Sequence, residues 1–189
     1  APEEIVKGAV RASKELDVDV VLVGKKEEVQ RCLAAEGASD IKVVDAREVI
    51  TMEDDPSTAT RRKKDASMTV ALNMVRDGMG DAVVSAGSTG ALLTGATLIV
   101  KRVKGIRRAA MGPTMPNKAG GKTVILDCGA NAECTPEFLL QFGLVGALHA
   151  KATYGVENPK VGLLNIGTED TKGTPLQKEA YGLLQKASE

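Results

Sequence analysis

The sequence is poor in aromatic residues. Its 189 residues include two Tyr, two Phe and no Trp. A protein surface that stacks successive nucleic-acid bases needs more aromatic side chains than this, so we exclude that class of binding surface. The hydrophobic core must instead be built from Ala, Val, Leu, Ile and Met.

The sequence also lacks net charge, since 25 basic residues balance 25 acidic ones. No overall electrostatic field therefore favours binding to nucleic acid or to an anionic membrane. The longest apolar segment, near residues 90–100, is about half as long as a membrane-spanning helix. Three cysteines without a disulfide spacing, and an acidic start without a signal peptide, predict a reduced cytoplasmic compartment.

What the sequence does contain is a repeated alternation of strand and helix patterns. Strands are predicted at residues 18–24, 41–44, 81–85, 109–111, 123–126 and 160–165, and helices at 3–16, 26–36, 66–76, 89–103, 136–152 and from 175 onward. Residues 50–64 show no clear period and predict a loop. The alternation predicts one α/β domain over residues 1–189, with a mostly parallel sheet and helices on both faces (αβα).

Three polar loops each follow a predicted strand and precede a predicted helix. Ligands of open α/β sheets bind at strand ends, so these loops form the candidate site. The first loop, residues 85–91, combines glycines with hydroxyl side chains before a helix N-terminus, which suits a phosphate group. The same pattern fits a helix N-cap with a tight turn equally well.

The second loop, residues 127–136, contains Asp127 and Asn131, which are suited to orienting a ligand. Five residues separate Cys128 from Cys134, and this spacing is not that of a zinc knuckle. We therefore expect inert thiols and no metal.

The third loop follows the apolar run 161–166 and carries Glu169, Asp170 and Lys172. The ammonium of Lys172 is suited to neutralising a phosphate or a developing oxyanion, and the carboxylates to holding the lysine or moving a proton. From residue types alone, a solvated turn that caps the next helix is the favoured interpretation. The lone His149 has no flanking motif, so no nucleophilic triad is predicted.

Four segments together resemble the PlsX family, the phosphate acyltransferases of bacterial phospholipid synthesis. These segments are RRKKDASM (61–68), SAGSTGAL (85–92), LDCGAN (126–131) and VGLLNIGTED (161–170), in the order expected for the family. The resemblance spans essentially the whole chain. It implies transfer of a fatty acyl group from acyl carrier protein to inorganic phosphate, without a nucleotide cofactor.

The resemblance also implies roles for individual residues. Lys172 would be catalytic, as a clamp for phosphate or oxyanion. The substrate-binding residues would be Ser85, Gly87, Ser88, Thr89, Gly90, Asn131, Asn165, Thr168 and Glu169. Carrier protein is acidic and would dock on a basic surface, for which the candidates are Arg61, Arg62, Lys63 and Lys64, and the cluster at 101–108. No metal is implied.

The family further implies a fold like that of the isocitrate/isopropylmalate dehydrogenases, a homodimer, and peripheral association with the membrane. This sequence departs from the family pattern in having Ser88 where Asn is usual. The family's first strand and a large C-terminal portion lie outside the sequence, so the fold would be incomplete and these 189 residues alone would show weak or no activity. Two alternatives remain open: a phosphate acetyl- or butyryltransferase that uses a coenzyme A thioester, and a non-catalytic fragment that binds phosphate or carrier protein.

Overall fold

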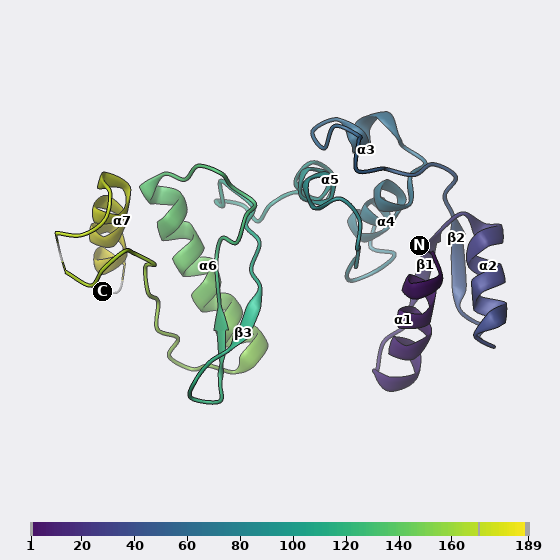
Figure 1. Ribbon diagram of the computed structural model, residues 1–189, viewed down its shortest axis with the longest axis horizontal. Coiled ribbons are helices and arrows are strands. Elements are labelled where there is room, and N and C mark those ends of the chain that lie inside the picture. The colour runs from purple at the N-terminus through teal and green to yellow at the C-terminus, as the bar shows by residue number, and fades with distance from the viewer. Residues whose placement is uncertain (1, 170, 188–189) are drawn as a thin grey trace. The chain divides into compact units, whose positions relative to one another are not determined.

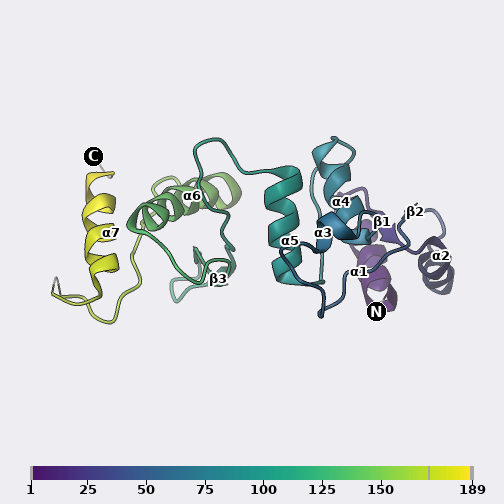
Figure 2. The same cartoon turned by 90° about the horizontal axis from the view of Figure 1, so that it is seen from above.

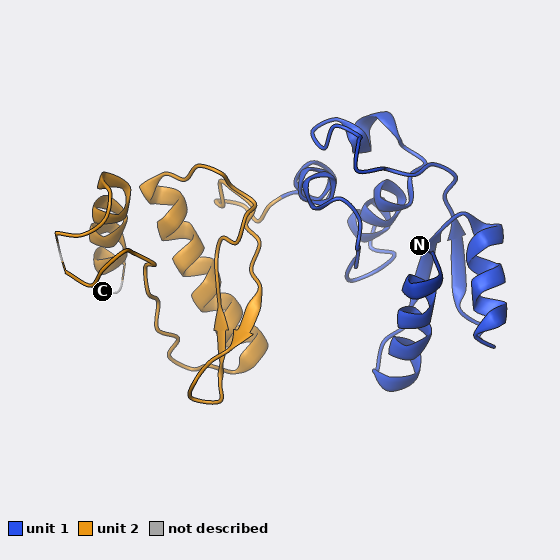
Figure 3. Ribbon diagram, in the orientation of Figure 1, with its two compact units in different colours: residues 1–101 blue, residues 102–189 orange. Residues whose placement is uncertain are grey.

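A computed structural model describes residues 2–169 and 171–187, which fall into two compact units, residues 1–101 and 102–189 (Figure 3). Unit 1 contains α1 (Pro2–Glu15), β1 (Val21–Gly24), α2 (Lys26–Ala35), β2 (Lys42–Asp45), α3 (Ala59–Arg62), α4 (Ser67–Arg76), α5 (Thr89–Gly95) and the π-helix η1 (Ala96–Val100). Unit 2 contains β3 (Thr114–Pro116), β4 (Lys122–Val124), α6 (Pro136–Tyr154) and α7 (Pro175–Lys186) (Figure 1).

The sheet of unit 1 is a β–α–β element. Strands β1 and β2 are parallel, with Val21 opposite Lys42 and Gly24 opposite Asp45, and α2 connects them. Parallel neighbours require such a crossover. The two strands lie between α4 on one side and α1 and α2 on the other (Figure 2). The predicted α/β class, with helices on both faces of a parallel sheet, is therefore confirmed for this small sheet.

Unit 1 has two apolar clusters. The first joins α1, β1 and α2 and consists of Val6, Val10, Leu22, Val29, Cys32, Leu33 and Ala38. The second joins α3, α4 and α5 and consists of Ala59, Met68, Leu72 and Ala91. Here α5 approaches α4 closely, because a Cβ added at Gly95 would lie 2.6 Å from Cδ1 of Leu72. This second cluster fixes the helix that follows the first polar loop.

Unit 2 has a much smaller core. Strands β3 and β4 form an antiparallel hairpin, and α6 packs against α7. The helices meet closely at Gly143, where an added Cβ would lie 2.8 Å from Cδ2 of Leu184. Among residues 102–169 and 171–187, the buried hydrophobic residues are Phe142 and Ala180. Unit 2 therefore depends strongly on hydrogen bonds made by its loops.

Asp127 organises the connection between β4 and α6. Its Oδ1 accepts hydrogen bonds from the backbone N–H of Met111 (2.8 Å) and Ala130 (3.1 Å). Its Oδ2 accepts from the backbone N–H of Asn131 (2.7 Å) and from Nδ2 of Asn131 (3.0 Å). Burial raises the pKa of Asp127, but these hydrogen bonds together hold that pKa below its ordinary value. One carboxylate thus ties the backbone at residue 111 to the backbone at residues 130–131.

Three predicted strands are wrong. Residues 81–85, 109–111 and 160–165 lie outside helices and strands, so the described residues hold two two-stranded sheets instead of one mostly parallel sheet. An apolar run indicates burial, whereas a strand also needs a neighbouring strand for its backbone hydrogen bonds. Val84, Leu164 and Ile166 are 98%, 90% and 87% exposed, which is unusual for such side chains. The predicted helix 89–103 ends early, at Val100, and its second part is π-helical.

Replacing Leu72 with alanine is expected to destabilise unit 1 by about 3 kcal/mol, because it leaves a cavity beneath α5. Leu72 is fully buried, whereas Leu98 of η1 is 52% exposed and serves as the matched control. Amide hydrogen exchange in α4 and α5 measures the effect. An equal loss of protection in Leu98→Ala would contradict the assigned core.

Asp127 is expected to make unit 2 acid-sensitive. Because its folded pKa lies below the ordinary 3.8, its contribution is fully present above that value and is lost as the pH falls through the lower, folded pKa. At neutral pH, Asp127→Asn should cost about 1 kcal/mol, since the turn is only half-buried.

The free energy of unfolding of unit 2 is measured in urea at several pH values, with hydrogen exchange of the α6 amides as the probe. In Asp127→Asn, the free energy of unfolding should fall less as the pH is lowered (the acid limb of the stability curve becomes flatter). Glu157→Gln removes an exposed carboxylate and should leave this acid limb unchanged. An unchanged acid limb in Asp127→Asn would show that the carboxylate does not hold the turn.

Candidate functional site

The three polar loops fall in different units. Residues 85–91 belong to unit 1, and the loops that contain Asn131 and Lys172 belong to unit 2. Each loop precedes a helix, namely α5, α6 or α7, as the sequence pattern predicts. That the three loops line one pocket stays a prediction.

The first loop is ordered by its own hydroxyl groups. Ser85 Oγ accepts a hydrogen bond from the backbone N–H of Gly87 at 3.2 Å, and Ser88 Oγ accepts from that of Ala91 at 3.4 Å. Ser88 is buried and caps α5, so the N-cap interpretation of this residue is confirmed. Gly90 lies against Pro56, where an added Cβ would come within 3.0 Å of that ring. Thr89 is exposed at the first position of α5.

In the second loop, most of the polar atoms of Asn131 form hydrogen bonds within the protein. Its Nδ2 donates to the carbonyl oxygen of Ala109 at 2.9 Å and to Oδ2 of Asp127 at 3.0 Å. Both amide hydrogens therefore have partners, and Oδ1 is the atom left to face a ligand. Burial, followed by the charge of Asp127, raises the pKa of the Cys134 thiol, which disfavours a reactive thiolate.

The third loop is closed by the side chain of Asn165. Asn165 Nδ2 donates to the carbonyl oxygen of Lys172 at 3.3 Å, and its Oδ1 accepts from the backbone N–H of Ile166 at 2.9 Å. Gly173 has φ +91°, and a Cβ there would lie 2.7 Å from Asn165 Oδ1. Only glycine therefore suits this position, both for its backbone angle and for the space around it.

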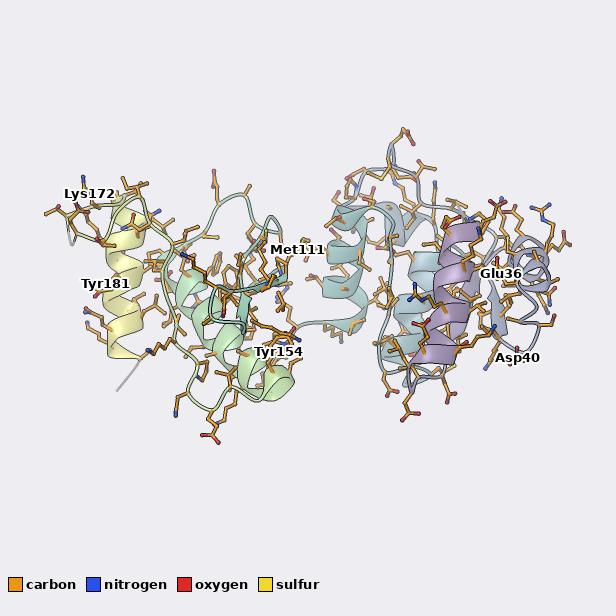
Figure 4. The ribbon with its side chains drawn as sticks, turned by 60° about the horizontal axis from the view of Figure 1, so that its bottom comes forward. Glu36, Asp40, Met111, Tyr154, Lys172 and Tyr181 are labelled. Carbon is orange, nitrogen blue, oxygen red and sulfur yellow. The ribbon has the colours of Figure 1, made fainter. Side chains whose placement is uncertain are left out.

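Lys172 is exposed on this closed loop, just before α7 (Figure 4). Its backbone N–H donates to the carbonyl oxygen of Glu169 at 2.9 Å. No carboxylate of the described residues lies within ion-pair distance of its ammonium, and Asp170 lies outside those residues. Glu169 thus shapes the loop through its backbone, while the ammonium faces solvent.

Thr168 and Glu169 are exposed beside Lys172, and Gly167 lies under both charged side chains. A Cβ at Gly167 would lie 2.6 Å from Oε2 of Glu169 and 2.9 Å from Cγ of Lys172. The N-terminus of α7 follows immediately, with Thr174 bonded to Gln177 in a capping box. A cation beside a helix N-terminus is a suitable arrangement for binding an anion.

The two basic clusters differ in their surroundings. Lys63 Nζ donates to Asp54 at 2.5 Å and to the carbonyl oxygen of Val49 at 2.7 Å, so it is committed to the loop at 49–54. Arg61, Arg62 and Lys64 are exposed. The cluster after residue 101 is instead held by Gln141 of α6, a residue that no sequence motif singles out.

Other chemistry is not indicated in the described part of the chain. No group of three or more His, Cys, Asp or Glu residues is placed to hold a metal ion there. None of its helices has the length and hydropathy to cross a bilayer. An open hollow of about 410 Å³ lies beside α2 and β2. It is lined by Lys26, Gln30, Leu33, Ser39, Ile41 and Val43, none of which is a predicted site residue.

Comparison with known proteins identifies the family of the chain that carries these loops. The model of the family described as "Fatty acid synthesis protein" matches residues 1–189. A "Phosphate acyltransferase" of Desulfitobacterium hafniense (strain DSM 10664 / DCB-2) is 47% identical over 188 residues, which are 99% of this chain and 56% of that protein.

Similar proteins occur in other bacteria. A "Phosphate acyltransferase" of Synechocystis sp. is 48% identical over 192 residues, covering all of this chain and 55% of the relative. One of Bacillus cereus is 45% identical over 188 residues, covering 99% of the chain and 56% of the relative. The chain thus spans about half the length of the curated relatives that it matches. It belongs to the fatty acid synthesis protein family, the PlsX family of phosphate acyltransferases.

Proposed function

We propose that this chain contributes substrate-binding and catalytic loops to a phosphate acyltransferase. The reaction moves a fatty acyl group from an acyl carrier protein thioester to inorganic phosphate, and the acyl phosphate serves glycerophospholipid synthesis. Family membership over the whole chain supports the reaction class. The observation that carries the assignment is the exposed Lys172 on a loop that Asn165 and two glycines hold closed.

The chemistry requires little covalent help from the protein. A phosphate oxygen attacks the thioester carbonyl, a tetrahedral oxyanion forms, and the C–S bond then breaks to release the carrier thiolate, which takes up a proton. A thioester already has a good leaving group, so no protein nucleophile is needed. The protein's task is to hold phosphate near the carbonyl and to stabilise the oxyanion.

Lys172 is suited to this task because it is exposed and precedes Thr174, the N-cap of α7, by two residues. A compact cation attracts phosphate and also stabilises negative charge that develops on the carbonyl oxygen. Glu169 and Thr168 would border the bound anion. Asn165 would act mainly by holding the loop, since its amide bonds to the carbonyl oxygen of Lys172.

The other substrate-binding residues are proposed with narrower roles than their side chains suggest. In the first loop, Ser88 caps α5, so phosphate would meet the exposed Thr89 hydroxyl and backbone N–H groups between Ser85 and Gly90. In the second loop, Asn131 would offer Oδ1, because its amide hydrogens already have partners.

The family resemblance supports several wider proposals. The complete protein would have a dehydrogenase-like αβα fold formed as a single domain by residues 1–189 together with further residues. It would be a cytoplasmic homodimer with peripheral membrane association. It would bind no nucleotide cofactor and no metal.

Lys172→Ala is expected to lower turnover by about 100- to 1,000-fold, because it removes a cation from the developing oxyanion. The assay uses a chimera in which this chain replaces the matched residues of the Desulfitobacterium hafniense relative. Acyl phosphate is trapped with hydroxylamine and released thiol is counted. Lys160→Ala removes another exposed lysine of unit 2 and is the matched control.

Near-normal turnover in Lys172→Ala would refute the role of the lysine. Turnover with acetyl-coenzyme A, but none with a long-chain carrier-protein thioester, would refute the proposed substrate. Phosphate binding without any turnover in the unaltered chimera would identify a binding module instead of an enzyme.

A further inference from the structure

Residues 102–108 form a basic loop at the start of unit 2. It contains Arg102, Lys104, Arg107 and Arg108 and no acidic residue. All four side chains are exposed, and none forms an ion pair with a carboxylate of the described residues. The pKa of the Glu137 carboxyl group is lowered mainly by a hydrogen bond from the Thr135 side chain. The charge of Arg107 also lowers this pKa, although Arg107 lies beyond ion-pair distance of Glu137.

The basic loop has a defined shape, because Gln141 of α6 holds it with both ends of its amide. Gln141 Oε1 accepts from the backbone N–H of Arg107 at 2.9 Å, and Nε2 donates to the carbonyl oxygen of Gly105 at 3.0 Å. Gly105 has φ +94°, which favours glycine at this turn. Arg102 Nε closes the loop from within by donating to the carbonyl oxygen of Ile106 at 3.1 Å.

The loop is also anchored to the helix by an aromatic contact. The guanidinium of Arg108 lies 5.6 Å from the ring centroid of Phe138, in the first turn of α6. Four cations are thus presented together on a loop that α6 holds at residues 105, 107 and 108. A run of merely solvated charges needs no such support.

The rival cluster at 61–64 has a different electrostatic setting. Lys63 is paired with Asp54, the charge of Arg62 acts on Asp55, and Asp65 follows directly in the sequence. Its positive charge is therefore partly neutralised within unit 1. The basic loop at 102–108 forms no ion pair with a carboxylate of the described residues, although the charge of Arg107 acts on Glu137.

We propose that the basic loop is a docking surface for an acidic protein, and, resting on the proposed function, that this protein is the acyl carrier protein. Complementary charge steers encounter, and a fixed arrangement of cations selects one orientation of the partner. Val103, which lies between Arg102 and Lys104 in the sequence and is 78% exposed, adds an apolar side chain to this surface.

The pinned backbone favours a protein partner over a lipid surface. Binding to anionic lipid depends on the number of cations near the headgroups and on inserted apolar side chains, and a fixed loop shape adds little to it. The one aromatic ring at this site, Phe138, lies under Arg108 and is half-buried. The Gln141 clamp should therefore affect protein docking but leave lipid binding unchanged.

The test measures binding of the 189-residue chain to purified acyl carrier protein at low ionic strength, by fluorescence anisotropy. Lys104→Gln with Arg107→Gln is expected to weaken binding about tenfold. Neither side chain makes a hydrogen bond or an ion pair with the described residues, so the fold should persist. Gln141→Ala should also weaken binding, although it leaves the net charge unchanged.

Two matched double variants complete the test. Lys14→Gln with Arg31→Gln removes the same charges from exposed positions on α1 and α2, and binding should stay within about twofold of the unaltered chain. Arg61→Gln with Lys64→Gln tests the rival cluster. Equal weakening by all three double variants, or a larger loss from the rival cluster, would overturn the proposal.

Vesicles with anionic headgroups test whether the basic loop binds a membrane surface instead of the acidic carrier protein. Loss of vesicle binding in Lys104→Gln with Arg107→Gln, with carrier-protein binding unchanged, would make the loop a membrane contact and overturn the proposal. If the unaltered chimera does not use the carrier-protein thioester, that result would instead contradict the proposed function. If the chimera does use that thioester, and Lys104→Gln with Arg107→Gln leaves its KM for the thioester unchanged, the proposed docking surface is overturned but the proposed function is not.

Discussion

Side-chain hydrogen bonds to backbone groups hold the polar loops of this protein in place. In unit 2 the buried apolar residues are few, and amide and carboxylate side chains take up the task of connecting segments. Asp127 joins residues 111, 130 and 131, Asn165 spans its loop to the carbonyl of residue 172, and Gln141 fixes the basic loop. Buried or half-buried backbone donors require such partners, so the shape of each candidate surface follows from them.

This constraint decides which side chains remain free for chemistry. A polar residue that stabilises a loop has fewer atoms to offer a ligand, as the capping hydroxyl of Ser88 and the amide of Asn131 show. Lys172 has the opposite arrangement, because its loop is held by other residues and by its own backbone. Its ammonium is then available for an anion, which is the requirement of a reaction in which phosphate attacks a thioester directly.

The sequence predicted the longer helices and the β1–α2–β2 element well, because helical periodicity and strand–turn–helix patterns are local. It missed the short helix α3 (Ala59–Arg62), which lies within residues 50–64, predicted as a loop. The end of α6 at Gly155, with a left-handed backbone, follows the usual preference for glycine there. The strands at 81–85 and 160–165 failed because pairing depends on a neighbouring strand that an apolar run does not specify. The structural tasks of Asn131 and Gln141 depend on carbonyl groups 22 and 36 residues away, which no local motif reveals. The interpretation favoured from residue types, a solvated turn that caps the next helix, agrees with the exposed Lys172 and the capping box of α7. The catalytic role of Lys172 stays a prediction.

Lys172 is the cation that we propose receives phosphate. NMR of lysine side chains, with ¹³C-labelled methyl groups on their nitrogens, follows each lysine of the chain while inorganic phosphate is added. We expect a saturable shift of the Lys172 signal that is larger than that of exposed lysines such as Lys160, and that persists when added chloride keeps the ionic strength constant. A Lys172 signal that moves no more than those of the other exposed lysines would contradict it.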